Sequence, residues 1–262
     1  MQCDYNELKM NVLLVEPEYS QAKRTKHEAK LCPVGLYKHY FFHISKGDKV
    51  CLVRGCVTPK IKPDMIKITS LFTYWSKDVF KAIEFYSKTY PNAIIKVGGI
   101  FASLMPEVIR ENNSDVVVHP GIDKEVEYVS IDWKHLKRNI QILHASRGCI
   151  RRCKFCGVRK IEPRITYKTW KQLKKEIQLN DIVFFDNNFL MNPNHKDILE
   201  GIDNHRVNDK VIRCESQSGF DPRLLTQEDA ILLKKARFKN IRISWDHNLK
   251  QKKVVRRALS YL

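Results

Sequence analysis

The sequence lacks the features that mark membrane, secreted and disordered proteins. No apolar run in its 262 residues approaches the roughly 20 needed to cross a bilayer, and the N-terminus has no basic segment followed by an apolar one. Gly and Pro are scarce, with ten of each, and no internal repeat recurs. We therefore expect a globular, cytoplasmic protein with no membrane partner.

Acidic residues are also few relative to basic ones. The chain has 29 Asp and Glu against 47 Lys and Arg, a formal net charge of +18, and most of the excess follows Arg138. Such a charge attracts phosphates and other anions. The basic residues of the second half fall mainly on predicted helices, where a solvated helix face is sufficient explanation. A nucleic-acid partner stays open but is not favoured.

The first half of the chain alternates short β-branched runs with helical patterns. Between the third and fourth runs, Ser76 is expected to cap a helix that ends near Pro91. Five strands with helical crossovers predict a doubly wound parallel sheet over residues 1–138, with ligands at the carboxyl ends of the strands. The five predicted strands are Asn11–Pro17, Lys49–Gly55, Met65–Phe72, Ala93–Gly99 and Asp115–Gly121.

A second series of β/α units fills residues 139–262. Four such units are too few to close a barrel, so the sequence predicts a partial β/α barrel that stops early, as in a truncated product. The predicted strands are Ile140–Ser146, Ile182–Asp186, Val211–Glu215 and Asn240–Trp245. The predicted helices are Thr169–Gln178, Asn194–His205, Gln227–Ala236 and Lys250–Tyr261.

Three closely spaced cysteines carry the most specific signal. The chain has eight Cys and no secretion signal, which favours metal or redox chemistry over disulfides. Cys149, Cys153 and Cys156 follow the first strand of the second half, and thiolates are soft ligands for iron or zinc. Three thiolates would leave one iron of a four-iron cluster open. A zinc site with a distant fourth ligand, or three buried cysteines, are the alternatives.

With Phe155 directly before the third cysteine, this spacing resembles the signature of the radical S-adenosylmethionine (SAM) superfamily. The resemblance implies a [4Fe-4S] cluster on Cys149, Cys153 and Cys156. It further implies that SAM chelates the open iron and is cleaved by one electron to a 5′-deoxyadenosyl radical, with Phe155 near the adenine. An electron donor such as flavodoxin or ferredoxin would be a partner.

The same resemblance assigns SAM contacts to polar residues at the strand ends. Asp186, Asn188, Glu215 and Ser244 would hold the methionine and ribose parts, with Asn188 and Glu215 as first choices. Gly148, which directly precedes the first cysteine, belongs to this cofactor-binding set. A helix cap or a turn is the alternative for each polar side chain.

The first domain resembles the cobalamin-binding domain of one radical SAM subfamily. The likeness rests on strand ends at which glycines let the backbone approach a nucleotide-like tail. The chain has no Asp-x-His-x-x-Gly string, so that histidine would not hold the lower face of the corrin. A degenerate domain without cofactor is the alternative. The residues implied in cobalamin binding are Thr69, Ser70, Gly98, Gly99 and Gly121.

Together these resemblances imply a radical SAM enzyme, with cobalamin-dependent methylation of an unactivated carbon as the leading hypothesis. A methylthiotransferase-like enzyme acting on tRNA or protein is a second reading, with Cys3, Cys32, Cys51 and Cys56 available for another cluster. A non-catalytic remnant that binds a cofactor or nucleic acid is a third. The substrate, small or macromolecular, and the catalytic residues beyond the cluster cannot be identified from the sequence.

Overall fold

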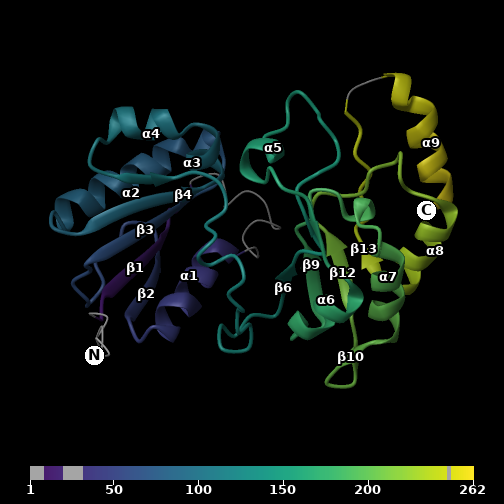
Figure 1. Cartoon of the computed structure of the whole chain (residues 1–262), viewed down its shortest axis with the longest axis horizontal. Coiled ribbons are helices and arrows are strands. Elements are labelled where there is room, and N and C mark those ends of the chain that lie inside the picture. The colour runs from purple at the N-terminus through teal and green to yellow at the C-terminus, as the bar shows by residue number, and fades with distance from the viewer. Residues whose placement is uncertain (1–8, 20–31, 247–248) are drawn as a thin grey trace, which may run out of the picture. The chain divides into compact units, whose positions relative to one another are not determined.

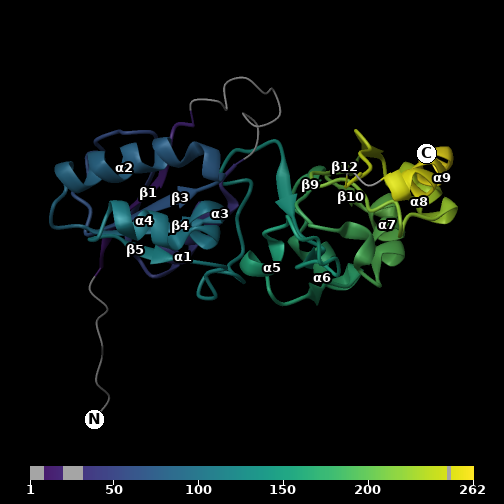
Figure 2. The ribbon, with the colours of Figure 1, turned by 90° about the horizontal axis from the view of Figure 1, so that it is seen from above.

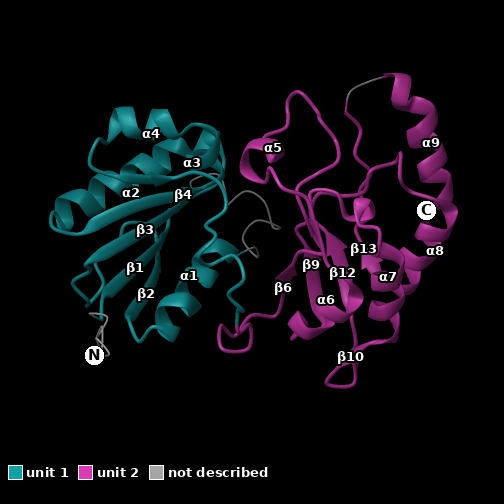
Figure 3. Cartoon of the chain, viewed as in Figure 1, with its two compact units in different colours: residues 1–131 teal, residues 132–262 magenta. Residues whose placement is uncertain are grey.

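The chain forms two compact units in a computed structural model that describes residues 9–19, 32–246 and 249–262. The first unit is Met1–Ile131 and the second is Asp132–Leu262 (Figure 3). The sequence placed this division at residues 138 and 139. No helix among the described residues has the length and apolar character that a membrane crossing requires.

The first unit is a five-stranded parallel sheet in the order β2-β1-β3-β4-β5, as the doubly wound prediction requires. Helix α1 lies on one face, and α2, α3 and α4 lie on the other (Figure 1). Its strands are β1 (Asn11–Glu16), β2 (Lys49–Arg54), β3 (Met65–Ser70), β4 (Ile94–Gly99) and β5 (Val117–His119). Its helices are α1 (Val34–Ser45), η3 (Thr73–Trp75), α2 (Ser76–Thr89), α3 (Ile100–Leu104) and α4 (Pro106–Asn112).

Strand β1 is an interior strand of this sheet, and both of its faces are apolar. Val12 and Leu14 pack under α1, whereas Leu13 and Val15 join the larger core beneath α2 and α3. Alternate side chains of a strand point to opposite faces, so a near-continuous apolar run predicts a central strand covered by helices on both sides.

Helix α2 begins and ends close to the predicted positions, but its cap differs. Ser76 is the first helical residue rather than the cap, and no side-chain hydrogen bond caps this helix. The 3₁₀ turn η3 leads directly into α2, which leaves no extended residue in the capping position. The inner face is apolar as predicted, with Val79, Ile83 and Tyr86 buried.

The second unit has a four-stranded parallel sheet in the order β13-β12-β9-β6, with α6, α7 and α8 along one side (Figure 2). The strands of that sheet are β6 (Gln141–Leu143), β9 (Asp181–Phe184), β12 (Arg213–Ser216) and β13 (Phe238–Lys239). Two hairpins add β7 (Ser146–Arg147) with β8 (Thr166–Tyr167), and β10 (Arg206–Val207) with β11 (Lys210–Val211). The helices are α5 (Val158–Ile161), α6 (Trp170–Glu176), η4 (Phe189–Met191), α7 (His195–Asn204), α8 (Gln227–Lys235), η5 (Leu249–Gln251) and α9 (Lys252–Tyr261).

The core of the second unit is aromatic at its centre. Phe184 stacks on Phe238 with ring centroids 5.8 Å apart, and Phe189 and Phe220 contact Phe238 edge-on or tilted. Aromatic side chains bury large areas and favour such offset and edge geometries. Through this cluster, β9 and β13 pack against the segments that follow β9 and β12.

Two strand predictions in this unit need correction. The strand expected over Asn240–Trp245 is replaced by the two-residue β13 and an isolated bridge between Phe220 and Ile243. Arg237 and Asn240 both have positive φ, which breaks the extended backbone on either side of β13. The third strand begins at Arg213 instead of Val211, because residues 206–211 form the β10–β11 hairpin.

Candidate functional site

The cysteine loop leaves β7 through a glycine turn. Gly148 has φ of +75°, and a Cβ there would lie 2.7 Å from the carbonyl oxygen of Arg164. The backbone N–H of Gly148 donates to Glu162 Oε2 over 2.7 Å, and Arg147 and Asn187 donate to the same carboxylate. Glu162, which the sequence analysis did not single out, therefore anchors the start of the loop.

The three cysteines lie on this loop at graded depth. Cys149 and Cys153 are half-buried, Cys156 is exposed, and the N–H of Cys156 donates to the carbonyl of Cys153 over 3.1 Å. Burial raises the pKa of the Cys153 thiol, and Asp246 and the other two thiols raise it further, while Arg223 lowers it.

The donor chemistry of the loop fits an iron-sulfur cluster. Three thiols on one short segment are soft ligands, and they leave one iron of a four-iron cluster without a protein thiolate. Within residues 9–19, 32–246 and 249–262, no three His, Cys, Asp or Glu side chains converge on a point as a closed metal site does. Phe155, between the second and third cysteines, is 75% exposed.

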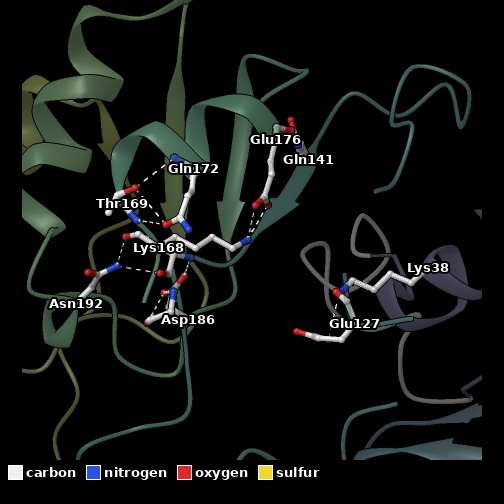
Figure 4. A network of polar contacts seen from close by, with 11 residues as sticks. Lys38, Glu127, Gln141, Lys168, Thr169, Gln172, Glu176, Asp186 and Asn192 are labelled. Carbon is white, nitrogen blue, oxygen red and sulfur yellow. Dashed lines mark hydrogen bonds and ion pairs between the residues drawn. The ribbon is translucent and has the colours of Figure 1, made fainter. Parts of the chain in front are cut away.

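The residues that follow β9 are buried and largely bonded within the chain. The Asp186 carboxylate accepts from the Ala145 N–H at 3.0 Å and from the N–H and hydroxyl of Ser146, both at 2.6 Å (Figure 4). Burial raises the pKa of Asp186 to about 6, against these hydrogen bonds. Asn192, in the same network, donates to the carbonyls of Ala145 and Lys168. Asp186 therefore binds the end of β6 to β9.

Asn188 differs from Asp186 in having an unused acceptor. Its Nδ2 donates to Asp221 Oδ2 over 3.3 Å, whereas its Oδ1 is buried without a hydrogen-bond partner. An unpaired buried carbonyl is costly, so each such atom in a folded protein calls for an explanation. A hydrogen-bond donor of a bound ligand would satisfy this one.

Glu215 lies near the end of β12, and Ser244 lies in the segment that follows β13. Glu215 accepts from Arg242 Nη2 over 2.9 Å and from Asn240 Nδ2 over 3.4 Å. The Ser244 hydroxyl donates to the Phe220 carbonyl over 3.0 Å. Both polar side chains thus have partners within the unit.

Asp221 is a central residue of this edge that sequence reasoning missed. Its side chain is 4% exposed and pairs with Arg151 of the cysteine loop at 2.7 Å and with Arg223 at 2.6 Å. Although burial opposes ionisation, hydrogen bonds from Arg223 and Arg151 hold the pKa of Asp221 below its ordinary value. Asp221 lies five residues beyond the end of its strand, so no strand-end pattern pointed to it.

The carboxyl edge of the first sheet is a compact network of hydroxyls and glycines. The buried Ser70 hydroxyl donates to the Gly98 carbonyl over 2.7 Å and accepts from the Ala102 N–H. Ser103 bridges Gly99 and Gly121 in the same way, at 2.6 and 2.8 Å. This network brings together the ends of β3, β4 and β5, as the sequence predicted.

Close backbone approach explains one glycine of this edge directly. Gly99 has φ of +102°, and a Cβ there would lie 2.1 Å from the Ser70 carbonyl oxygen. Only glycine adopts this conformation without strain. Thr69, the remaining predicted residue, is half-buried, and its carbonyl accepts from the Tyr19 hydroxyl over 3.2 Å.

An aromatic group beside this edge was not predicted. Tyr19 stacks on Trp75 with ring centroids 4.6 Å apart, and Phe72 stacks on Tyr74 at 5.1 Å. Tyr74 is 60% exposed and Trp75 is buried. The aromatic run after β3 was visible in the sequence, but Tyr19 belongs to a different strand end.

Among the described residues, the N-terminal cysteines form no group of three potential metal ligands. Cys32 is buried, Cys51 lies in β2, and Cys56 lies near the Lys81 carbonyl. Burial raises the pKa of both the Cys51 and the Cys56 thiol. Cys3, the fourth cysteine of the second-cluster reading, lies outside the described residues.

Two solved structures resemble the chain in fold. Both are the radical S-adenosylmethionine methyltransferase TsrM from Kitasatospora setae, one with tryptophan substrate and the SAM analogue aza-SAM bound and one with cobalamin and a [4Fe-4S] cluster bound. The first has a TM-score of 0.72 and 14% identity over 97% of this chain and 65% of that one. The second has a TM-score of 0.70 and 13% identity over 97% of this chain and 67% of that one.

The chain therefore spans about two thirds of the length of these methyltransferase chains. No protein-family model matches it, and no curated protein does. At this level of identity the likeness establishes the architecture. The chain shares the α/β fold of these two structures, with a five-stranded parallel sheet followed by a four-stranded β/α unit.

Proposed function

We propose that this chain is the cluster-bearing and corrinoid-binding part of a radical SAM enzyme, with methylation of an unactivated carbon as its reaction. The observation that carries the proposal is the position of the cysteine loop. Arg151 of this loop pairs with Asp221, which lies five residues beyond the end of β12, at 2.7 Å. The loop therefore faces the edge where β/α proteins bind their ligands.

The residues of the second unit supply position and an electrostatic frame. When bound, a [4Fe-4S] cluster and SAM supply one-electron cleavage of the sulfonium to a carbon-centred radical. Cys149, Cys153 and Cys156 would hold three irons, and the unpaired Asn188 Oδ1 would accept from an amino or hydroxyl group of the bound ligand. Asp186, Asn188 and Asp221 are buried at this edge, whereas Cys156 on the loop is exposed.

The first unit would bind cobalamin at its carboxyl edge. Gly98 and Gly99 have no side chains and are partly exposed, so they would permit close approach of a large ligand to the backbone. The hydroxyls of Ser70 and Ser103 fix that backbone by donating to the carbonyls of Gly98 and Gly99. The exposed ring of Tyr74 adds an aromatic surface beside the same edge.

The test is anaerobic reconstitution of the whole chain with iron, sulfide and hydroxocobalamin, followed by desalting and visible spectroscopy. We expect a cluster absorption band, about one retained corrinoid per chain, and release of 5′-deoxyadenosine from SAM under reducing conditions. Cys153→Ala should lose the cluster and SAM cleavage and keep the corrinoid. Cys56→Ser, in the first unit, is the matched cysteine control and should keep all three.

Each outcome separates the two parts of the proposal. SAM cleavage that survives in Cys153→Ala would remove the cluster assignment. Loss of all corrinoid with an intact cluster would shift the proposal to cobalamin-independent hydrogen abstraction. A second cluster of about four additional irons per chain, lost on substitution of Cys32 or Cys51, would favour the methylthiotransferase-like reading instead.

A further inference from the structure

The ion pairs around Asp221 connect the middle of the cysteine loop to the second sheet. Arg151 Nε donates to Asp221 Oδ2 over 2.7 Å, and Arg223 donates to both oxygens of the same carboxylate at 2.6 and 3.2 Å. Asn188 Nδ2 adds a longer contact of 3.3 Å. The carboxylate is nearly inaccessible to solvent, and each arginine side chain is 30% exposed.

Arg151 lies between two cysteines of the loop, so fixing its side chain also restricts the backbone that carries them. It lies two residues after Cys149 and two before Cys153, and its own backbone N–H donates to Cys149 Sγ over 3.4 Å. The start of the loop is held independently, because Glu162 accepts from the Gly148 N–H. Fixing Arg151 as well leaves only the exposed part around Phe155 and Cys156 without a buried anchor.

We infer that Asp221 is a positioning residue: through Arg151 it docks the cysteine loop on the carboxyl edge of the second sheet before any metal is bound. The docking itself follows from the protein's own contacts. Its consequence for an iron-sulfur cluster rests on the proposed function. Ordering the loop in advance removes part of the entropy cost of bringing three thiolates to one cluster.

A purely local role for Asp221 would give different behaviour. Asp221 also forms a turn of its own, because its side chain accepts from the Arg223 N–H and its carbonyl accepts from the N–H of Leu224 and Leu225. Asp221→Asn therefore perturbs the turn and the loop together. Arg151→Met removes only the loop partner and leaves the pair between Asp221 and Arg223 intact, so it is the discriminating variant.

Limited trypsin digestion of the metal-free protein measures the docking directly. Arg152 and Lys154 are exposed, lie inside the loop and remain in every variant. Loss of a charge-assisted hydrogen bond to a buried carboxylate should raise cleavage at these two residues about tenfold or more in Arg151→Met. Arg151→Lys keeps the positive charge, so its cleavage rate at these two residues should lie between those of wild type and Arg151→Met.

Two controls separate docking from general loss of stability. Arg213→Met breaks the exposed pair with Asp181 and should leave cleavage after Arg152 at the wild-type rate. Asp229→Asn removes a buried carboxylate that accepts from the N–H of Thr226, the N-cap of α8, and pairs with His195, so it should lower the unfolding midpoint without selective cleavage of the loop. In the double variant Arg151→Met with Asp221→Asn, the increase should be less than the product of the two single effects, because both remove one contact.

Reconstitution then tests the consequence for metal binding. Arg151→Met should take up less iron per chain than wild type at limiting iron, and its reduced form should give a broadened electron paramagnetic resonance signal. Loop cleavage within twofold of wild type in Arg151→Met would overturn the inference. If the wild-type chain takes up no iron, the proposed function fails, and the digestion comparison alone decides whether Asp221 docks the loop.

Discussion

The carboxyl edges of the two sheets are built from different chemistry. At the first edge, Ser70 and Ser103 bridge glycine backbones at the ends of β3, β4 and β5 through short hydrogen bonds. The partly exposed ion pair of Glu16 and Arg54 joins the ends of β1 and β2. The second edge is charged and buried, and its carboxylates at Asp186 and Asp221 are each held by several donors. The glycine contacts of the first edge hold neighbouring strand ends close together, whereas the buried carboxylate of Asp221 at the second edge fixes the position of the cysteine loop.

The sharpest test of the first edge is Gly99→Ala. The added Cβ would overlap the Ser70 carbonyl, and the positive φ is unfavourable for alanine. We expect a loss of about 3 to 5 kcal/mol in the free energy of unfolding, measured by urea titration. Gly35→Ala is the control, since a Cβ at Gly35 in α1 meets nothing within 4 Å. It should be neutral or stabilising, and equal losses in both variants would contradict the close-approach argument.

The pH dependence of Asp186 tests the burial of the second edge. Its pKa in the folded chain is about 6, above the ordinary 3.8, so the folded chain binds this proton more tightly than the unfolded chain does. The contribution of this group to stability is therefore highest below about pH 4 and falls as the pH rises to 6. We expect wild type to lose about 2 to 3 kcal/mol relative to Asp186→Asn over this interval.

The pH dependence of stability that Asp221 causes should have the opposite sign to that of Asp186, in the same unit. The pKa of Asp221 is lowered in the folded chain, so its contribution to stability is present above the ordinary Asp pKa and is lost as the pH falls through the folded value. Urea titrations of wild type, Asp186→Asn and Asp221→Asn from pH 3 to pH 7 measure the two slopes. Parallel slopes for the two variants would show that the carboxylates share one environment.

Ser70→Ala compares hydroxyls at the two edges. It leaves the Ala102 N–H without its acceptor and the Gly98 carbonyl without its side-chain donor, so we expect a loss of about 2 kcal/mol in the free energy of unfolding. At the second edge, Ser244→Ala should cost less than about 1 kcal/mol, because the Phe220 carbonyl keeps the Ser244 N–H as a donor. A reversed order would mean that the second edge is the more tightly packed one.

The smallest expected effect concerns helix caps. Thr169 caps α6 in a reciprocal capping box with Gln172 (Figure 4), whereas Ser76 makes no cap at the start of α2. Thr169→Ala should therefore lower the free energy of unfolding by about 1 kcal/mol, and Ser76→Ala should change it by less than about 0.5 kcal/mol. Thermal unfolding of both variants measures the contrast, and a cost for Ser76→Ala equal to that for Thr169→Ala would refute it.

The sequence was most informative where periodicity alone decides structure. The strands of the first unit begin within two residues of their predicted positions, because parallel strands buried on both faces read as apolar runs. The strand predicted over Asn240–Trp245 is wrong, because positive φ at Arg237 and Asn240 interrupts the extended backbone there.

The candidate site was predictable in part for a related reason. Residues at or near the ends of strands, such as Asn188 and Glu215, can be placed by counting along the chain. Asp221 could not be, because its importance comes from Arg151, a partner 70 residues away. Glu162 escaped notice in the same way, since nothing local marks it as the acceptor for Gly148. Pairings between distant segments remain invisible to a reading of local patterns.

The stack of Tyr19 on Trp75 gives the first unit a built-in optical reporter. Trp75 is the single tryptophan that precedes Asp132 in the sequence, and it lies beside the carboxyl edge where a corrinoid is proposed to bind. Substituting the three later tryptophans by phenylalanine would leave one fluorophore in the chain. Its emission would then follow the occupancy of that edge in real time, without a label and independently of turnover.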